Sequence, residues 1–137
     1  MNKLKITLSE KEVNENDIKK FETNFNILLP TNFIKFIKKY NGGLVKNSED
    51  VRKFLHIKYG SLNIENLIDA HQITEQNIPS GYLPIALDYS SNPITINLNE
   101  GQDYGKIVVF ELDFEGDGFV ISNSLEQLLG VASIDDL

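Results

Sequence analysis

Apolar residues recur with helical spacing in the first part of the chain. Three of them lie three and four positions apart, as on one face of a helix: Ile18, Phe21 and Phe25. Asn14 precedes them, and its side chain can accept a hydrogen bond from the first turn of a helix. The pattern predicts a helix over about residues 14–25.

A second apolar stripe follows Leu29-Pro30. Proline disfavours helical geometry in the residue before it, so the first helix has to end there. Thr31 or Asn32 can cap a new helix, whose apolar positions are Phe33, Phe36, Ile37 and Tyr40. Asn41-Gly42-Gly43 supplies residues that tolerate left-handed geometry and predicts the end of this helix.

The rest of the chain is dominated by strand signals. Residues 54–60 alternate apolar and polar side chains, which predicts a strand with His56 and Lys58 on its polar face. The apolar runs 83–87 and 94–98 are joined by turn-forming residues and read as a hairpin. Residues 106–114 and 119–122 predict another pair of strands.

Two short helices complete the pattern. Asn63 can cap one that carries Ile64, Leu67 and Ile68, and Leu125, Leu128 and Leu129 predict another that ends at Gly130. Together these elements predict an α+β fold, with two N-terminal helices, an antiparallel or mixed sheet and a short C-terminal helix packed on it. At 137 residues we expect one domain, spanning 1–137.

Charge is distributed unevenly along the chain. The net charge is −7, but residues 1–60 hold twelve Lys and Arg against seven Asp and Glu, whereas residues 61–137 hold only Lys106 against thirteen acids. Phosphate binding depends on clustered Lys and Arg, so we expect no nucleic-acid partner. A cationic protein is the complementary partner, and a merely solubilising acidic surface is the alternative.

Composition excludes several other classes of protein. The chain has no cysteine, which excludes disulfides, thiol nucleophiles and zinc–thiolate sites. Its N-terminus lacks the apolar core of a signal peptide, and no apolar run is long enough to span a bilayer. We therefore expect a cytoplasmic protein that does not bind a membrane.

The stretch 113–124 allows three interpretations. Acids at its first, third and fifth positions and a glycine at its sixth resemble the start of an EF-hand calcium loop, but Ser124 stands where a bidentate glutamate is needed. It can also be a hairpin turn with solvated acids. The third interpretation is an acidic contact patch for a partner, formed by Glu111, Asp113, Glu115 and Asp117.

No catalytic constellation stands out. The two histidines, His56 and His71, lie on different predicted elements, with no nucleophile elbow and no HExxH pattern beside them. No glycine-rich phosphate loop is present. We expect no cofactor, no metal and no enzymatic activity, and a carboxylate-pair hydrolase is the weakest of the hypotheses.

Several motifs, taken in order, resemble the SUKH superfamily of Smi/Knr-type domains. They cover roughly residues 14–130 and include the following: Leu29-Pro30, Phe33, Phe36, Tyr40-Asn-Gly-Gly43, Leu83-Pro-Ile-Ala-Leu-Asp88, Asn92 and Asp103-Tyr-Gly-Lys-Ile107. The resemblance implies the SUKH fold. Its motifs have structural roles and nominate no catalytic residue.

The resemblance also implies two functions. Bacterial members look like immunity proteins of contact-dependent or polymorphic toxin systems, which bind and neutralise a cognate toxin, often a nuclease. Fungal relatives are regulatory proteins linked to cell-wall synthesis. An acidic inhibitor suits a cationic nuclease, so the immunity role is the leading hypothesis and a regulatory interaction module is the alternative.

Overall fold

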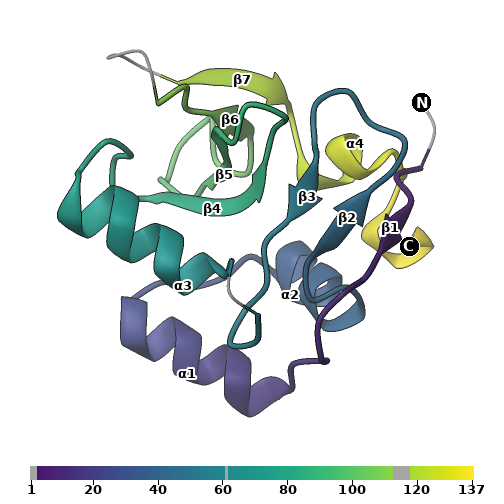
Figure 1. Cartoon of the computed structure of the whole chain (residues 1–137), viewed down its shortest axis with the longest axis horizontal. Coiled ribbons are helices and arrows are strands. Elements are labelled where there is room, and N and C mark those ends of the chain that lie inside the picture. The colour runs from purple at the N-terminus through teal and green to yellow at the C-terminus, as the bar shows by residue number, and fades with distance from the viewer. Residues whose placement is uncertain (1–2, 61, 113–117) are drawn as a thin grey trace.

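The strands form a single antiparallel sheet in which each strand pairs with the next along the chain (Figure 1). The computed structural model describes residues 3–60, 62–112 and 118–137. Within these residues the strands are β1 Ile6–Thr7, β2 Gly43–Val45, β3 Lys53–Phe54, β4 Tyr82–Leu87, β5 Pro93–Asn97, β6 Ile107–Val109 and β7 Phe119–Ser122. With helices packed against this sheet, the predicted α+β architecture is confirmed.

Helix α1, Glu15–Phe25, begins and ends as predicted. The side chain of Asn14 accepts a hydrogen bond from the Asp17 N–H, while the Asp17 carboxylate accepts one from the Asn14 N–H, so both ends of a capping box are present. Asn26 ends the helix in a left-handed conformation.

Helix α2, Thr31–Lys39, begins one step earlier than predicted. Pro30 occupies the cap position and makes no side-chain hydrogen bond, so the prediction that Thr31 or Asn32 caps this helix is wrong. Both residues lie inside the first turn, where the fixed φ of Pro30 (−61°) leads directly into the helix. The amide of Asn32 instead donates to a carboxylate oxygen of Glu126, at 2.8 Å.

The predicted strand over residues 54–60 is largely wrong. Only Lys53–Phe54 forms a strand, β3, and the chain from Leu55 to Ile57 is buried without forming a regular ladder. His56 is 7% exposed and does not lie on a polar face. The alternation of apolar and polar residues does not mark a strand here, because the segment passes through the interior and then turns at Lys58, whose φ is +70°.

The second half follows its predictions more closely. Asn63 caps α3, Ile64–Leu67, which continues as a π-helical segment, η1, Ile68–Thr74. The hairpin of β4 and β5 is confirmed, as is the pairing of β6 with β7, although β6 ends at Val109 rather than at residue 114. Helix α4, Leu125–Leu129, ends at Gly130 in a left-handed conformation, as predicted.

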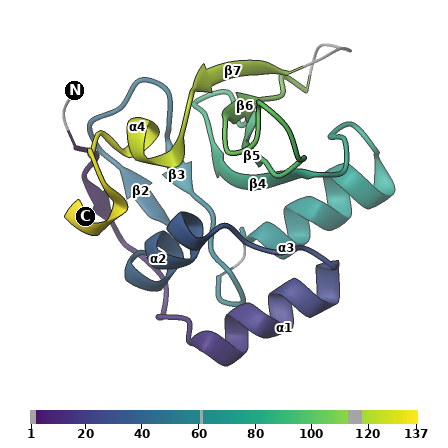
Figure 2. The same cartoon turned by 180° about the vertical axis from the view of Figure 1, so that it is seen from behind.

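The core joins the N-terminal helices to the sheet. In both views α1 and α2 lie together below the strands (Figures 1 and 2). The rings of Phe36 on α2 and Phe54 on β3 meet edge to face, with centroids 4.9 Å apart. Buried residues of α1, α2 and the strands form one continuous apolar cluster.

One row of side chains leads from this core to the surface. Across β4 to β7, Ala86 is opposite Ile94, Ile94 is opposite Val109, and Val109 is opposite Phe119. The first three are buried, whereas Phe119 is 51% exposed. The apolar layer of the sheet therefore ends in an exposed aromatic ring on the last strand.

Candidate partner-binding groove

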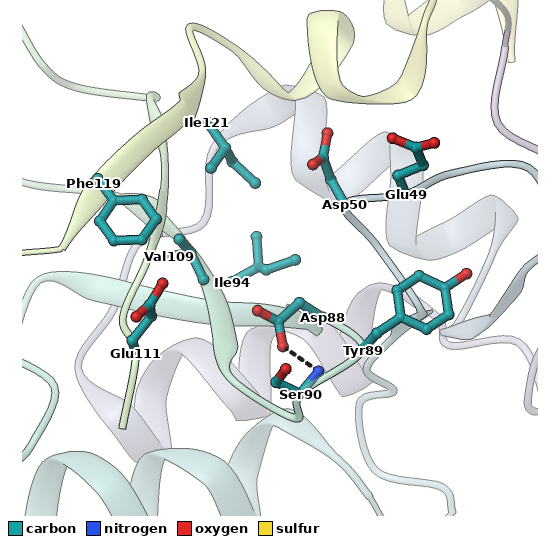
Figure 3. A pocket seen from close by; sticks show the side chains of 10 residues that line it. All are labelled: Glu49, Asp50, Asp88, Tyr89, Ser90, Ile94, Val109, Glu111, Phe119 and Ile121. Atoms are coloured by element: carbon teal, nitrogen blue, oxygen red, sulfur yellow. Dashed lines mark hydrogen bonds between the residues drawn. The ribbon is translucent and has the colours of Figure 1, made fainter. Parts of the chain in front are cut away.

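A groove opens where this row reaches the surface (Figure 3). It has a volume of about 250 Å³, and its apolar floor consists of Ile94, Val109 and Ile121. Figure 3 shows Phe119 and Glu111 on one side of this floor, and Glu49, Asp50 and Tyr89 on the other. The groove thus has a small apolar floor, and most of its accessible lining is polar.

Four carboxylates surround the groove, and they come from three connections between strands. Glu49 and Asp50 lie between β2 and β3, Asp88 lies between β4 and β5, and Glu111 follows β6. Within the described part of the chain, none of the four lies within 4.0 Å of a Lys, Arg or His nitrogen. No ion pair with another described residue therefore neutralises their negative charge.

Asp88 differs from the other three because its carboxylate stabilises the turn in which it lies. Its carboxylate accepts hydrogen bonds from the N–H groups of Ser90 and Asn92, at 2.9 and 2.8 Å, and from the Asn92 amide at 3.2 Å. This is the local bonding by which aspartate stabilises turns. Glu49, Asp50 and Glu111 are left as the carboxylates that can meet a partner.

The two connections that form one wall are tied to each other. The hydroxyl of Tyr89 donates to the carbonyl oxygen of Ser48 at 3.0 Å, and a guanidinium nitrogen of Arg52 lies 3.5 Å from the hydroxyl of Ser91. The ring of Tyr89 nevertheless stays 57% exposed. This side of the groove is pre-formed and presents an aromatic ring, which lowers the entropy cost of binding.

A second hollow of about 410 Å³ continues the groove along β7. It shares Glu49, Asp50 and Ile121 with the first and is also lined by Gln127 of α4. A separate hollow of about 790 Å³ lies between the end of α1 and η1, where its lining includes Leu28 and Ile73. Of the described residues that line this hollow, Glu100 is the only charged one, so the hollow offers little to a cationic partner.

Glu111 lines the groove as one member of the predicted acidic patch. The other three, Asp113, Glu115 and Asp117, lie outside the described residues, so the patch as a whole stays a prediction. Sequence reasoning missed Glu49 and Asp50 because they belong to the half of the chain with a positive balance. The adjacent acids in the polar loop 46–50 were the available signal.

The EF-hand alternative also falls partly outside the described residues, since these begin again at 118. The described end of that stretch forms β7, not the start of a helix. Among the residues that the structure describes, no three His, Asp or Glu side chains are grouped so that they could hold a metal ion.

The histidines take no part in the groove. His56 is buried beside Gly42 and Gly60, and burial lowers the pKa of its ring. His71 lies on η1, where its Nδ1 is 3.1 Å from the side-chain oxygen of Asn77. Neither lines the groove, which is built from carboxylates, aromatic rings and aliphatic side chains.

The fold and the groove define an α+β protein with a surface suited to binding another protein. A family model, the SMI1/KNR4 family (SUKH-1), matches residues 12–130. The chain belongs to this family, and the predicted SUKH resemblance is confirmed. Membership supports a protein-interaction role of the immunity or Smi/Knr type.

A search of curated proteins found no match to the chain. Among the described residues, none of the helices has the length and apolar character that a membrane crossing requires.

Proposed function

We propose that this chain is a non-enzymatic immunity protein, which binds a cognate toxin of a contact-dependent or polymorphic system in the cytoplasm and neutralises it. The observation that carries the proposal is the groove. There the carboxylates of Glu49, Asp50 and Glu111, which form no ion pair with another described residue, surround an apolar floor. A SUKH-family chain with such a surface is suited to hold a cationic protein.

The charge of the groove favours a toxin that acts on nucleic acid. A nuclease must present Lys and Arg to bind phosphates, and carboxylates placed on that surface would block it. Complementary charge also raises association rates from about 10⁵–10⁶ towards 10⁸–10⁹ M⁻¹s⁻¹ at low salt. Rapid capture matters to a cell that a single toxin molecule can damage.

Co-expression tests this function directly. The toxin domain is taken from the C-terminus of the large secreted protein encoded nearest to this chain and is induced in cells with or without it. We expect the wild-type chain to restore growth, and E49K/D50K/E111K to fail while still folding. The control is E12K/D69K, which reverses two exposed acids that do not line the groove.

Failure of the wild-type chain to protect cells against that domain would contradict the immunity role. The alternative is then a regulatory interaction module of the fungal-relative kind, for which the groove would bind an endogenous protein. Rescue that survives charge reversal of the groove would keep the immunity role and place the interface elsewhere.

A further inference from the structure

The last strand of the sheet has an open edge beside the groove. Within the described residues β7 pairs only with β6, and Figure 1 shows it as the outermost strand on its side of the sheet. Phe119 and Val120, which point to opposite faces of the sheet, are each 51% exposed. The edge is therefore accessible both at its backbone and on its two faces.

The hydrogen-bond pattern shows which backbone groups face outwards. The N–H of Phe110 donates to the Pro93 carbonyl at 3.1 Å, and the N–H of Asn97 donates to the Lys106 carbonyl at 2.9 Å. The backbone N–H and C=O groups of successive residues in a strand point alternately to its two neighbours. Those of Lys106 and Phe110 point to β5, so those of Val109 point to β7, where Val109 is opposite Phe119. The N–H and C=O of Val120 consequently point away from β6, towards the open edge.

Of the usual protections against pairing with another chain, the described part of this edge has a register shift but no charged residue and no proline. Exposed edges are commonly blunted by Lys, Pro or very short strands, but β7 reads Phe-Val-Ile-Ser and carries no charge. A register shift opposite Ile107 and Val108 is its one irregularity. The opposite edge, β1, has only two residues, and Leu8 with φ +58° turns the chain directly after it.

We propose that β7 is a docking edge for an extended, basic segment of a partner protein, which adds to the sheet as a further strand. The segment exchanges backbone hydrogen bonds with Val120 and lays Lys or Arg side chains over the groove, near Glu111 and Asp50. This inference rests on the proposed function, since it assigns the way in which the cationic partner is held.

The charge of the groove and the alternation of side chains along a strand specify the sequence of the partner segment. Side chains of an added strand alternate between the two faces of the sheet, so every second one lies on the face of Phe119 and the groove. Those positions suit Lys and Arg, which can pair with the groove carboxylates and stack on the Phe119 ring. The intervening positions lie beside Val120 and suit apolar residues.

Proline at position 120 tests the docking mode with little change to the fold. Because the N–H of Val120 points outwards, V120P removes the docking donor and leaves the β6 pairing intact, and proline is tolerated on edge strands in this orientation. V120T keeps the N–H and the β-branched shape and is the matched control. Amide exchange of β6 in the free variants checks that the ladder survives.

The probe is a synthetic peptide of alternating Lys and Val, about eight residues long, which is the length of an ordinary strand. We expect it to bind the wild-type protein and V120T, to slow amide exchange at Val120, and to weaken as salt rises. V120P should lower its affinity roughly tenfold, as expected for the loss of a backbone hydrogen bond. Methylation of alternate peptide nitrogens should have a similar effect.

Equal affinity of the peptide for V120P and V120T, or no binding to the wild-type protein, would overturn the docking edge. So would concentration-dependent dimerisation that V120P abolishes, because the edge would then serve a second copy of this chain. These results are separate from toxin rescue. If V120P still protects cells as well as V120T does, the immunity role stands and the added strand is wrong.

Discussion

At the scale of single residues, Asn41 ties three parts of the chain together. Its amide nitrogen donates to the carbonyl oxygens of Lys11 and Ile57, at 2.8 and 3.0 Å, and its amide oxygen accepts from the Ile57 N–H at 2.7 Å. Asn41 is only 2% exposed. In the Tyr40-Asn-Gly-Gly43 motif, this residue therefore holds the fold and does not face the groove.

Removal of the Asn41 amide should destabilise the protein strongly. N41A leaves the buried N–H of Ile57 without its partner and removes one donor each from the carbonyl oxygens of Ile57 and Lys11. We therefore expect the free energy of unfolding to fall by about 2–4 kcal/mol. Urea unfolding followed by circular dichroism measures the difference. N16A is the control, because Asn16 is exposed on α1, and a change comparable to that of N41A there would contradict the assignment.

His56 occupies a cradle that two glycines make possible. A Cβ added at Gly42 would lie 2.5 Å from its Cδ2, and one added at Gly60 would lie 2.6 Å from its Nδ1. Nδ1 has no hydrogen-bond partner among the described residues. Burial is the main cause that lowers the pKa of the ring, and Lys53 lowers it further, while the carboxylate of Glu10 opposes them.

The lowered pKa of His56 predicts a loss of stability in mild acid. In the unfolded chain the ring of His56 has a pKa of about 6.5, so it binds a proton below that pH, whereas in the folded chain it stays neutral to lower pH. The free energy of unfolding therefore falls as pH decreases. The loss continues until pH reaches the folded pKa. Urea unfolding between about pH 7.5 and 5 measures the slope.

H56Q should flatten that slope. H71Q changes the only other histidine and leaves the contribution of His56 in place, so it should retain the fall in stability. A slope that H56Q leaves unchanged would show that His56 does not resist protonation in the folded state.

At the scale of elements, the connection from α2 to β2 depends on glycine. Gly42 has φ +76°, and an added Cβ would meet the His56 ring and, at 3.0 Å, the carbonyl oxygen of Phe54. Gly105 has a similar φ, +85°, and no atom of the described residues lies within 4 Å of a Cβ added there. Alanine at Gly105 therefore introduces backbone strain alone, whereas alanine at Gly42 adds a collision with the core.

G105A should cost only the strain of a left-handed residue, about 1–2 kcal/mol. G42A adds a collision with a buried ring and should cost about 2–5 kcal/mol in all. Parallel urea unfolding of both variants checks this order. Equal losses would show that the His56 cradle can relax around a methyl group.

Elements with local signals could be predicted from the sequence. The caps at Asn14 and Asn63, the helix end at Gly130 and the hairpin turn at Asp88 all depend on bonding within a few residues. The segment 54–60 could not be predicted in this way. Its two-residue strand and buried His56 result from packing against α2 and the loop at Gly42, which are distant in sequence.

At the scale of the whole molecule, charge along the chain differs from charge in space. Lys35 pairs with Asp135 near the C-terminus at 3.0 Å, Lys38 pairs with Glu15, and Lys58 pairs with Asp17 at 2.7 Å. Among the described residues, three of the twelve Lys and Arg of the first half thus form ion pairs, and of their partners only Asp135 comes from the second half. The groove, by contrast, combines Glu49 and Asp50 from the first half with Glu111 from the second.

This is why sequence reasoning found one groove residue, Glu111, and missed its neighbours. Summing charge over each half assigned Glu49 and Asp50 to a positive region. In the sheet β7 lies four strands away from β3, yet the loop with Glu49 and Asp50 lines the same hollow as Ile121 of β7, so this proximity follows from the three-dimensional course of the chain. Residues that come together in this way leave no local pattern in the sequence.

The central claim is that the groove binds a cationic toxin, and a calorimetric titration tests it most directly. The toxin domain encoded nearest to this chain is titrated into the wild-type protein and into E49K/D50K/E111K, at low and high salt. We predict tight binding to the wild-type protein that weakens with salt and is lost in the variant. Affinity that neither salt nor the variant changes would contradict the claim.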